Sequence, residues 1–249
     1  VEDCFHIAIE ACTIARKYST PVIILSDQAI ATRIEAFAEP DLEKNWIEPE
    51  LDLAERGADF KPYPLGQLTR HAPPGSRLSD GKYPVVTGLE HDEWGHPSGN
   101  PENHESMTAK RRQKLMDIAA NLPEPPFYGD ESGDLIFIGW GSTYGPIKEA
   151  TQRLRKAGYK VGSLHLRHIH PLRSGLDEIF NRYTHILVPE MNDSGAYGYG
   201  QLATMLRAKT CNPAIRSLNK VQGLTFRVRE ITEAAEKLLA SGHAYKEDK

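Results

Sequence analysis

The residues best suited to chemistry gather in one stretch, "TGLEHDEWGHPSGNPENH" at positions 87–104, which holds three histidines, four carboxylates, three glycines and two prolines. Because imidazole and carboxylate groups bind several divalent metal ions, this stretch could be a metal site, a catalytic loop or a rigid strap beside another chain's active site. A metalloprotease motif of the HExxH type needs a helix that places both histidines on one face. The glycines and prolines exclude such a helix, and the spacing selects no particular metal.

A loop with a fixed, irregular path is the interpretation that this composition favours. Loops held by a rigid scaffold commonly carry the residues that bind ligands or take part in catalysis. Glu90, His91 and Asp92 are therefore the candidate functional residues of the stretch. A metal-dependent hydrolase that uses His91, Asp92, His96 and His168 is kept as an alternative hypothesis.

Two further candidates, Asp27 and Arg33, follow the apolar run "VIIL" at 22–25. A short continuous apolar run predicts a strand covered on both faces, as in parallel sheets. Asp27 would then lie at the ligand-facing end of that sheet, where it either caps the next helix or forms the rim of an active site. Arg33 is either a charged clamp or, as the more ordinary interpretation, a solvated surface residue.

Two other motifs follow expected strands farther along the chain. The turn "GWGSTYGP" at 139–146 could cradle a phosphate at a helix N-terminus, but a tight strand-to-helix turn capped by Ser142 or Thr143 is the simpler interpretation. The segment "HLRHIHP" at 165–171 brings histidines near the carboxyl end of a strand. Their period-two spacing divides them between two faces, which argues against a shared metal ion, and we assign no metal ligands in this chain.

The elements that would position these residues divide the chain into three regions. Residues 1–40 are interpreted as the carboxyl-terminal end of an α/β domain, and the run "EDCFHIAIEACTIARKY" within them is expected to form a helix with Asp3 as its N-cap. That helix is apolar on almost all sides and is therefore expected to be buried within a larger body. Residues 41–130 are rich in proline and are expected to form a long ordered linker.

Residues 131–249 alternate strands with helices, which predicts a parallel sheet with helices on its faces. One helix is also expected within the linker, at 103–122. In the last region, strands are expected at 134–140, 159–167, 184–190 and 214–221, and helices at 141–158, 174–183, 199–209 and 227–241, with Gly242 just past the end of the last one.

The overall composition excludes several classes of protein. A net charge of -4 with both signs mixed along the chain argues against nucleic-acid binding, which needs a basic patch. No apolar run approaches the ~18 residues of a membrane helix, and no signal peptide is visible. The cysteines Cys4, Cys12 and Cys211 have no CxxC spacing, so they cannot hold an iron–sulfur cluster alone, and their sparse number suits a reducing cytoplasm.

Five sequence blocks, in one order, resemble a single family, the α subunits of 2-oxoacid:ferredoxin (acceptor) oxidoreductases, and most closely the 2-oxoglutarate type. The "TGLEHDE…GHP…PENH" block is the most specific of them. The resemblance implies the end of a pyrimidine-side thiamine-binding domain of parallel α/β type, then the linker, then a domain like the carboxyl-terminal domain of transketolase. The blocks are "PVIILSD", "TGLEHDEWGHPSGNPENHESMTAKRRQKL", "GWGSTYGPI", "HLRHIHPL" and "LVPEMN…GQLATMLRAK…LNKVQGLTF".

Enzymes of this family use thiamine diphosphate and Mg²⁺ to decarboxylate a 2-oxoacid, form an acyl-CoA and CO₂, and pass electrons through an iron–sulfur cluster to ferredoxin. The resemblance implies that a β subunit supplies the diphosphate site, the Mg²⁺ ligands and the cluster cysteines. The family's Tyr-Pro-Ile-Thr-Pro motif and its thiamine-activating glutamate do not occur here. The chain therefore resembles a carboxyl-terminal portion that is inactive alone, with no assignable catalytic residue.

On this resemblance, the 87–104 stretch is a strap between two domains that lies against the β subunit near the substrate pocket. Asp92 is the expected polar contact at that pocket, and His91 and Glu90 are neighbours that hold the loop. The loop "NDSGAYGYGQL" is longer than is usual in the family, which leaves the contacts there open. A non-catalytic interaction module built on residues 131–245 is the remaining alternative.

Overall fold

The computed structural model describes residues 1–45, 54–68 and 72–244 of the chain. These residues form two compact units, which are considered separately. The first unit comprises Val1–Ile24 and Ile34–Asn121, and the second comprises Leu25–Arg33 and Leu122–Lys249. No helix in the described ranges has both the length and the hydropathy that crossing a bilayer requires.

The second unit is built on a five-stranded sheet with the order β1-β3-β2-β4-β5. Strands β2 to β5 are parallel, whereas β1 pairs antiparallel with β3 at one edge. The α/β fold and the four parallel strands expected in residues 131–249 are confirmed, and β1 is an addition that the sequence did not predict. The strands are β1 (Phe127–Gly129), β2 (Gly133–Gly139), β3 (Val161–His165), β4 (Tyr183–Glu190) and β5 (Ile215–Asn219).

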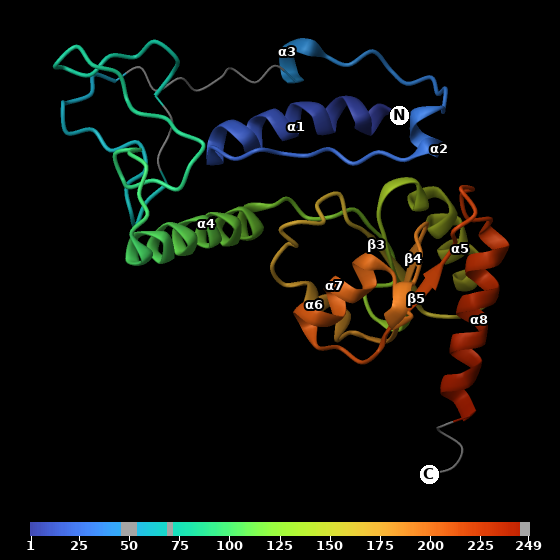
Figure 1. Cartoon of the computed structure of the whole chain (residues 1–249). Helices are drawn as coiled ribbons and strands as arrows, with labels where there is room; N and C mark the ends of the chain where they lie inside the picture. The colour runs from blue at the N-terminus through green and yellow to red at the C-terminus, as the bar shows by residue number, and fades with distance from the viewer. Residues whose placement is uncertain (46–53, 69–71, 245–249) are drawn as a thin grey trace. The chain divides into compact units, whose positions relative to one another are not determined.

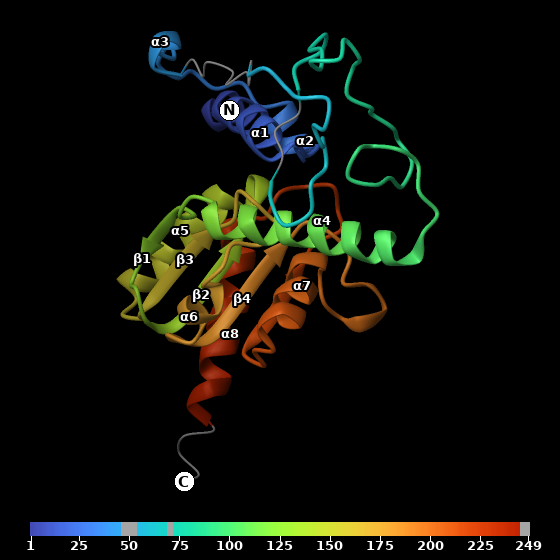
Figure 2. The same cartoon turned by 90° about the vertical axis from the view of Figure 1, so that its left-hand side faces the viewer.

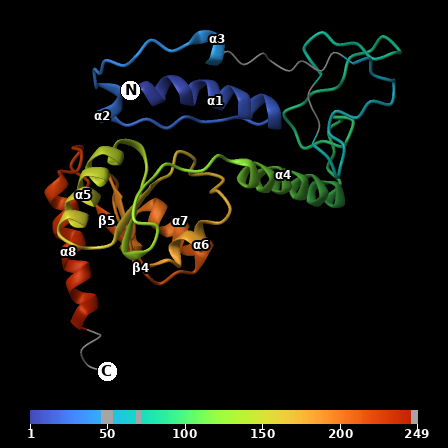
Figure 3. The same ribbon diagram turned by 180° about the vertical axis from the view of Figure 1, so that it is seen from behind.

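Helices cover both faces of this sheet because successive side chains of a buried strand point to opposite faces. Leu135 and Phe137 of β2 pack in the cluster formed with α5 and α8, and Ile136 and Ile138 pack in the cluster formed with α6 and α7. Figures 1 and 3 show these two helix pairs on opposite sides of the strands. The helical elements are η1 (Gly141–Thr143), α5 (Tyr144–Lys156), α6 (Leu176–Phe180), η2 (Gly195–Tyr197), α7 (Gln201–Thr210) and α8 (Val228–Ala244).

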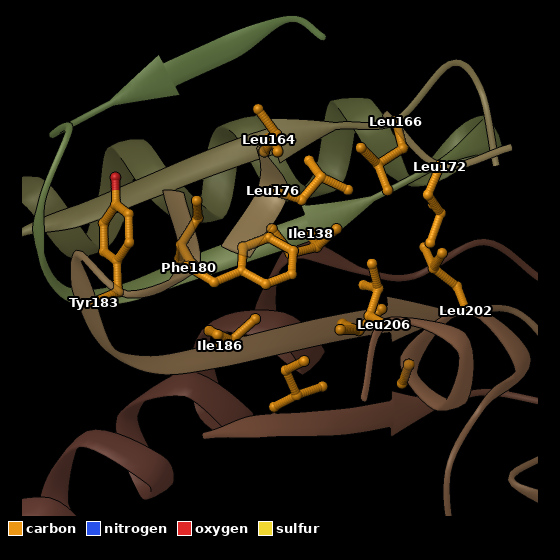
Figure 4. Packing of buried hydrophobic residues seen from close by; sticks show 14 residues of the cluster. Ile138, Leu164, Leu166, Leu172, Leu176, Phe180, Tyr183, Ile186, Leu202 and Leu206 are labelled. Carbon is orange, nitrogen blue, oxygen red and sulfur yellow. The ribbon is translucent and has the colours of Figure 1, made fainter. Parts of the chain in front are cut away.

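The larger of the two clusters is centred on Phe180 of α6. Figure 4 shows its ring among Ile138 of β2, Ile186 of β4 and Leu206 of α7. All four side chains are fully buried. Since burial of one such side chain stabilises a fold by about 1.5–3 kcal/mol, this cluster fixes the loops that leave the carboxyl ends of the strands.

The closing helix differs from its predicted extent. Gly242 was expected beyond the helix end, but α8 continues through this residue to Ala244, so the expectation was wrong. Glycine within a helix costs only about 1 kcal/mol relative to alanine. The apolar face that α8 packs against the sheet can offset a cost of this size. Ile231, Ala235 and Leu239, which lie on one face, anchor α8 to the sheet.

The first unit contains α1 (Glu2–Tyr18), α3 (Leu42–Asn45) and α4 (Pro101–Asn121). Helix α4 confirms the helix expected at 103–122, and it begins where Asn100 Oδ1 accepts a hydrogen bond of 2.7 Å from the Asn103 amide. Figure 2 shows the long irregular path that precedes α4. The first unit thus consists of helices joined by irregular chain, with no strand assigned in its described residues.

Helix α1 occurs where it was predicted, but it does not begin at the expected N-cap. Val1 rather than Asp3 precedes the first helical residue, so Asp3 lies in the first turn, where a carboxylate still favours the helix dipole. The helix is not buried on all sides, because only Ala11 and Tyr18 are buried. An all-apolar helix is buried only when other elements cover every side of it, and the described part of the chain does not do so.

The expectation of a buried strand at 22–25 is also wrong for this structure. The segment is extended and runs back beside α1 (Figures 1 and 3), but it is assigned to no strand. Ile23 is 82% exposed. A strand needs a neighbour to pair its backbone N–H and C=O groups, and no described strand pairs with this segment.

Candidate functional site

The candidate residues of the 87–104 stretch lie in a small hairpin of the first unit. The Asp92 amide donates to the His96 carbonyl and the Ser98 amide donates to the Glu90 carbonyl, each at 2.9 Å. Gly95 permits the turn because its φ is 86° and because a Cβ there would overlap the Val85 carbonyl. The loop therefore has the fixed path that its glycines and prolines predicted.

Asp92 shapes this hairpin with one of its two carboxylate oxygens. Its Oδ1 accepts hydrogen bonds from the amides of Trp94 and His96, both at 2.9 Å. Its Oδ2 lies 3.6 Å from His96 Nδ1, and the Asp92 side chain is 33% exposed. The carboxylate is thus an Asx-type turn element with one oxygen still available to a second contact.

Glu90 connects the hairpin to α4 through an ion-pair cluster. Its carboxylate accepts two hydrogen bonds from the Arg111 guanidinium, at 3.1 and 2.9 Å, and one of 2.5 Å from His104 Nδ1. The Arg111 guanidinium and then the His104 ring lower the pKa of Glu90 to about 2. Glu90 is therefore ionised at neutral pH, and its ion pairs connect the hairpin to α4.

His91 is held by packing as well as by hydrogen bonds. Its ring lies 3.9 Å from the Tyr63 ring, centroid to centroid. Its Nδ1 is 2.9 Å from the Asp92 carbonyl, and its own carbonyl accepts a hydrogen bond of 2.9 Å from Asn103 Nδ2. These contacts give His91 a structural role between the hairpin and α4.

Two residues that hold the same loop were not singled out in the sequence. Glu93 accepts hydrogen bonds of 2.9 Å from Lys61 Nζ and from the Leu65 amide. Lys110 donates to the Pro64 carbonyl, and burial, followed by the charge of Lys114, lowers its pKa to about 8. The basic run "KRRQK" that begins at Lys110 reads as a solvated helix face, so no sequence signal distinguishes this lysine.

Asp27 belongs to the second unit, where it caps α2 (Gln28–Ala31). Its Oδ1 accepts from the amides of Ala29 and Ile30, at 3.0 and 3.1 Å. Its Oδ2 accepts from the Ser142 amide at 3.0 Å. Burial alone would raise the pKa of Asp27, but the hydrogen bonds from Ser142 and the α2 amides outweigh burial and lower it.

The turn "GWGSTYGP" is therefore hydrogen-bonded to the Asp27 carboxylate of the same chain. Gly141, with a φ of 58°, leaves room for Asp27 Oδ2, and Thr143 Oγ1 accepts from the Trp140 amide at 3.1 Å. These hydrogen bonds agree with a tight strand-to-helix turn. A phosphate bound by this turn would need the Ser142 amide, which already donates to Asp27. Arg33 follows α2 with an exposed side chain.

A buried carboxylate that the sequence did not indicate lies at the carboxyl end of β4. Glu190 is fully buried and accepts hydrogen bonds of 2.9 Å from the amides of Leu202 and Ala203, at the start of α7. Asn192 Nδ2 donates a third at 2.9 Å. A Cβ on Gly200 would overlap this carboxylate, so the glycine before the "QLATM" helix was the one available signal.

The described structure brings the sequence candidates together in two groups. Glu90, His91 and Asp92 share one hairpin in the first unit, and Asp27 and Arg33 flank α2 in the second. Across residues 1–45, 54–68 and 72–244, no three His, Cys, Asp or Glu side chains are placed to hold a metal ion. Cys4, Cys12 and Cys211 are free and exposed.

Two family models match the chain in succession. Residues 1–110 match the thiamine-diphosphate-binding domain of pyruvate flavodoxin/ferredoxin oxidoreductases. Residues 133–231 match core domain II of pyruvate:ferredoxin oxidoreductase. The first match includes the hairpin with Asp92, and the second includes the sheet with Glu190.

Curated relatives and a solved structure are similar over nearly the whole chain. The 2-oxoglutarate oxidoreductase subunit KorA of Mycobacterium tuberculosis is 38% identical over 92% of this chain and 34% of its own length. Subunit alpha of 2-oxoacid:ferredoxin oxidoreductase 2 from Aeropyrum pernix is 29% identical over 96% of this chain and 37% of its own length. The chain thus spans about a third of these relatives.

The solved structure is 2-oxoglutarate:ferredoxin oxidoreductase from Magnetococcus marinus, with 2-oxoglutarate, coenzyme A and succinyl-CoA bound. It superposes with a TM-score of 0.81 and is 28% identical, over 96% of this chain and 41% of that chain. The path of the backbone is therefore similar in both proteins.

Proposed function

This chain is a homologue of KorA-type 2-oxoacid:ferredoxin oxidoreductase α subunits, and we propose that it works as part of such a subunit in an enzyme that oxidises 2-oxoglutarate. The reaction would release CO₂, form an acyl-CoA, and transfer electrons to ferredoxin. The observation that carries the proposal is the 38% identity to KorA over 92% of this chain. The similarity to an enzyme solved with 2-oxoglutarate and coenzyme A supports the substrate.

The proposed enzyme needs partners that supply its metal and cluster ligands. Thiamine diphosphate stabilises the carbanion that forms when a 2-oxoacid loses CO₂. The described residues of this chain do not group as ligands for Mg²⁺ or for an iron–sulfur cluster. We therefore assign those ligands to other polypeptide segments, with a β subunit as the principal partner, and expect this chain to be inactive alone.

The hairpin at 87–104 is proposed to present Asp92 to the substrate pocket at the β subunit. The Asp92 carboxylate uses Oδ1 for its turn, its Oδ2 lies 3.6 Å from His96 Nδ1, and its side chain is 33% exposed. The Glu90 ion pairs and the stacking of His91 on Tyr63 fix the loop before substrate binds. Such preorganisation lets a side chain contact substrate without a further loss of conformational entropy.

The experiment that tests the function is an assay of the assembled enzyme with its β subunit. We expect 2-oxoglutarate to reduce ferredoxin only when coenzyme A is present, and pyruvate to be a poorer substrate. Reduction that needs no coenzyme A, or that occurs only with other 2-oxoacids, would contradict the proposed reaction. Purified protein with stoichiometric zinc or manganese and hydrolase activity would favour the metal-dependent hydrolase instead.

The role of Asp92 is tested separately within that assay. Asp92→Asn should raise the KM for 2-oxoglutarate or lower kcat, because a neutral amide offers a weaker polar contact. Asp80→Asn is the matched control, since Asp80 also accepts a backbone hydrogen bond, from the Lys82 amide, and its side chain is 30% exposed. Identical kinetics for both variants would remove Asp92 from the pocket and leave the family-level function untouched.

A further inference from the structure

A cavity of about 100 Å³ lies within the second unit, and its lining includes Arg167 and His168 of the "HLRHIHP" segment. Its lining consists of the segment 122–126 and of Leu166, Arg167, His168 and Arg173. The basic residues follow β3 directly, on the loop that leaves its carboxyl end. Open parallel sheets bind their ligands at this end of the strands.

The lining of this cavity is rich in positive charge. Arg167 and Arg173 each contribute a guanidinium group, and His168 contributes an imidazole ring. Glu124 is the single acidic residue among the described lining residues, and its side chain is 76% exposed. The charge in the cavity therefore favours an anion.

The loop that carries these groups is fixed by the core. Leu166 and Leu172 are buried in the cluster beneath α6 and α7. Lys209 Nζ donates to the Leu172 carbonyl at 3.2 Å, and Arg173 Nη1 donates to the Ser174 carbonyl at 3.2 Å. Because the backbone is held on both sides of the basic residues, a ligand would meet preorganised donors.

Arg173 already binds one anionic group, the carboxylate of Glu124. Its carboxylate receives a hydrogen bond from Arg173 Nη2, although the glutamate side chain itself is mostly in solvent. Exposed ion pairs of this kind contribute little to stability, about 0–1 kcal/mol, so a better anion can displace the carboxylate. Without ligand, the Glu124 carboxylate would thus take the place of the ligand's anionic group on Arg173.

We propose that this cavity binds a phosphate group of a small molecule. Guanidinium groups match the oxygens of phosphate with two parallel hydrogen bonds, and two arginines with a histidine suit a dianion better than a single carboxylate. The volume admits one such group with the rest of the molecule outside. This inference does not depend on the proposed oxidoreductase function.

The test is isothermal titration of the full chain with inorganic phosphate, and separately with coenzyme A as a phosphate-bearing coenzyme. We expect saturable binding that weakens with added salt, and a loss of affinity of roughly tenfold or more in both Arg167→Gln and Arg173→Gln, since a charge-assisted hydrogen bond is lost. Glu124→Gln should tighten binding because it removes the competing carboxylate. Arg153→Gln, on the exposed face of α5, is the matched control and should bind as the parent does.

The outcomes separate the possible ligands and can overturn the site. If coenzyme A binds more tightly than phosphate and the arginine variants lose both, the ligand is a coenzyme; equal affinities indicate free phosphate. Arg173→Lys keeps the charge but loses the planar guanidinium, so it should bind phosphate with intermediate affinity. Such binding would show that the loss of affinity in Arg173→Gln is not caused by misfolding. No binding of either compound, binding unchanged in both arginine variants, or tighter binding of 2-oxoglutarate than of phosphate would overturn the proposal.

Discussion

Two apolar runs of this chain have nearly the same composition and opposite environments. The run "LIFI" at 135–138 forms the centre of β2, and all four of its side chains are fully buried. The run "VIIL" at 22–25 has exposed fractions between 36% and 82%. Strand β2 has β3 and β4 on its two sides and helices on both faces, whereas no described strand pairs with 22–25. Apolar composition indicates that a segment can be buried, and its neighbours decide whether it is.

The same contrast holds for the carboxylates of the two units. Asp92 in the first unit and Glu190 in the second each accept two backbone amide hydrogen bonds. Asp92 remains partly exposed, whereas Glu190 is fully buried. An unmade hydrogen bond costs more in a buried site than at the surface. Asp92 receives both bonds on Oδ1, whereas Glu190 receives one on each oxygen. Loss of the carboxylate should therefore have a larger effect on stability at Glu190.

The largest expected effect tests the comparison of the two apolar runs. Phe137→Ala should lower the free energy of unfolding by about 3–5 kcal/mol, because it leaves a cavity between the sheet and α5. Ile23→Ala should change it by less than about 0.5 kcal/mol, as for other exposed positions. Urea unfolding of the chain measures both values. A large loss with Ile23→Ala would mean that the run at 22–25 is covered in solution.

The next effect concerns the buried carboxylate. Glu190→Gln should lower the free energy of unfolding by about 1–3 kcal/mol, because an amide can accept only through one atom and leaves an α7 amide without its partner. Asp92→Asn should cost about 1 kcal/mol or less, since asparagine keeps the Oδ1 that accepts both amide hydrogen bonds and the side chain is partly exposed. Thermal unfolding of the two variants sharpens the comparison. Equal shifts would show that burial does not set the difference.

A smaller effect, with a defined pH dependence, is expected for Asp27. Its pKa is lowered in the folded chain, so its contribution is complete above the unfolded pKa, near ~3.9, and is lost as the pH falls through the folded value. Asp27→Asn should cost about 1 kcal/mol at pH 7, because an amide nitrogen in the place of Oδ2 cannot accept the hydrogen bond from the Ser142 amide. The difference between variant and parent should shrink in unfolding experiments below pH ~3. A difference that stays constant with pH would exclude the charged carboxylate as its cause.

The smallest effect tests the ion-pair cluster of the hairpin. Arg111→Gln should raise the pKa of Glu90 from about 2 toward its ordinary 4.5, because Arg111 is the main cause of the shift. Arg112→Gln, at the neighbouring exposed position, should leave it unchanged. NMR titration of the Glu90 carboxyl carbon reports both values. Stability should change little, as is usual for ion pairs at a surface.

Much of the fold was predictable because its signals are local. The strands contain continuous apolar runs at 135–138 and 186–189, and each is followed by a helix. Strand β1 has three residues after a proline-rich segment, which is too short for any periodic pattern. The residues of the hairpin were predictable as a group, since the glycines and prolines around them restrict the path of the loop.

The functions of single residues within the site were less predictable. Asp27 had two interpretations of equal weight, and the hydrogen bonds from the Ala29 and Ile30 amides support the capping role. Glu190 was not identified because it ends a strand, and its partners Leu202 and Ala203 are found only once α7 is placed against β4. The assignment of Asp92 to a substrate pocket and the boundaries of the three regions stay predictions.

The sequence by itself determined the order of helices and strands from residue 131 onward, the fixed course of the 87–104 loop and the family resemblance, because each depends on residues that are close together in the chain. The tertiary structure alone decided that Glu90 pairs with Arg111, 21 residues away, and that Asp27 meets Ser142, 115 residues away. It also decided that the apolar run at 22–25 is exposed. Contacts between distant segments, and the burial that results from them, depend on how elements pack and not on the local pattern of residues.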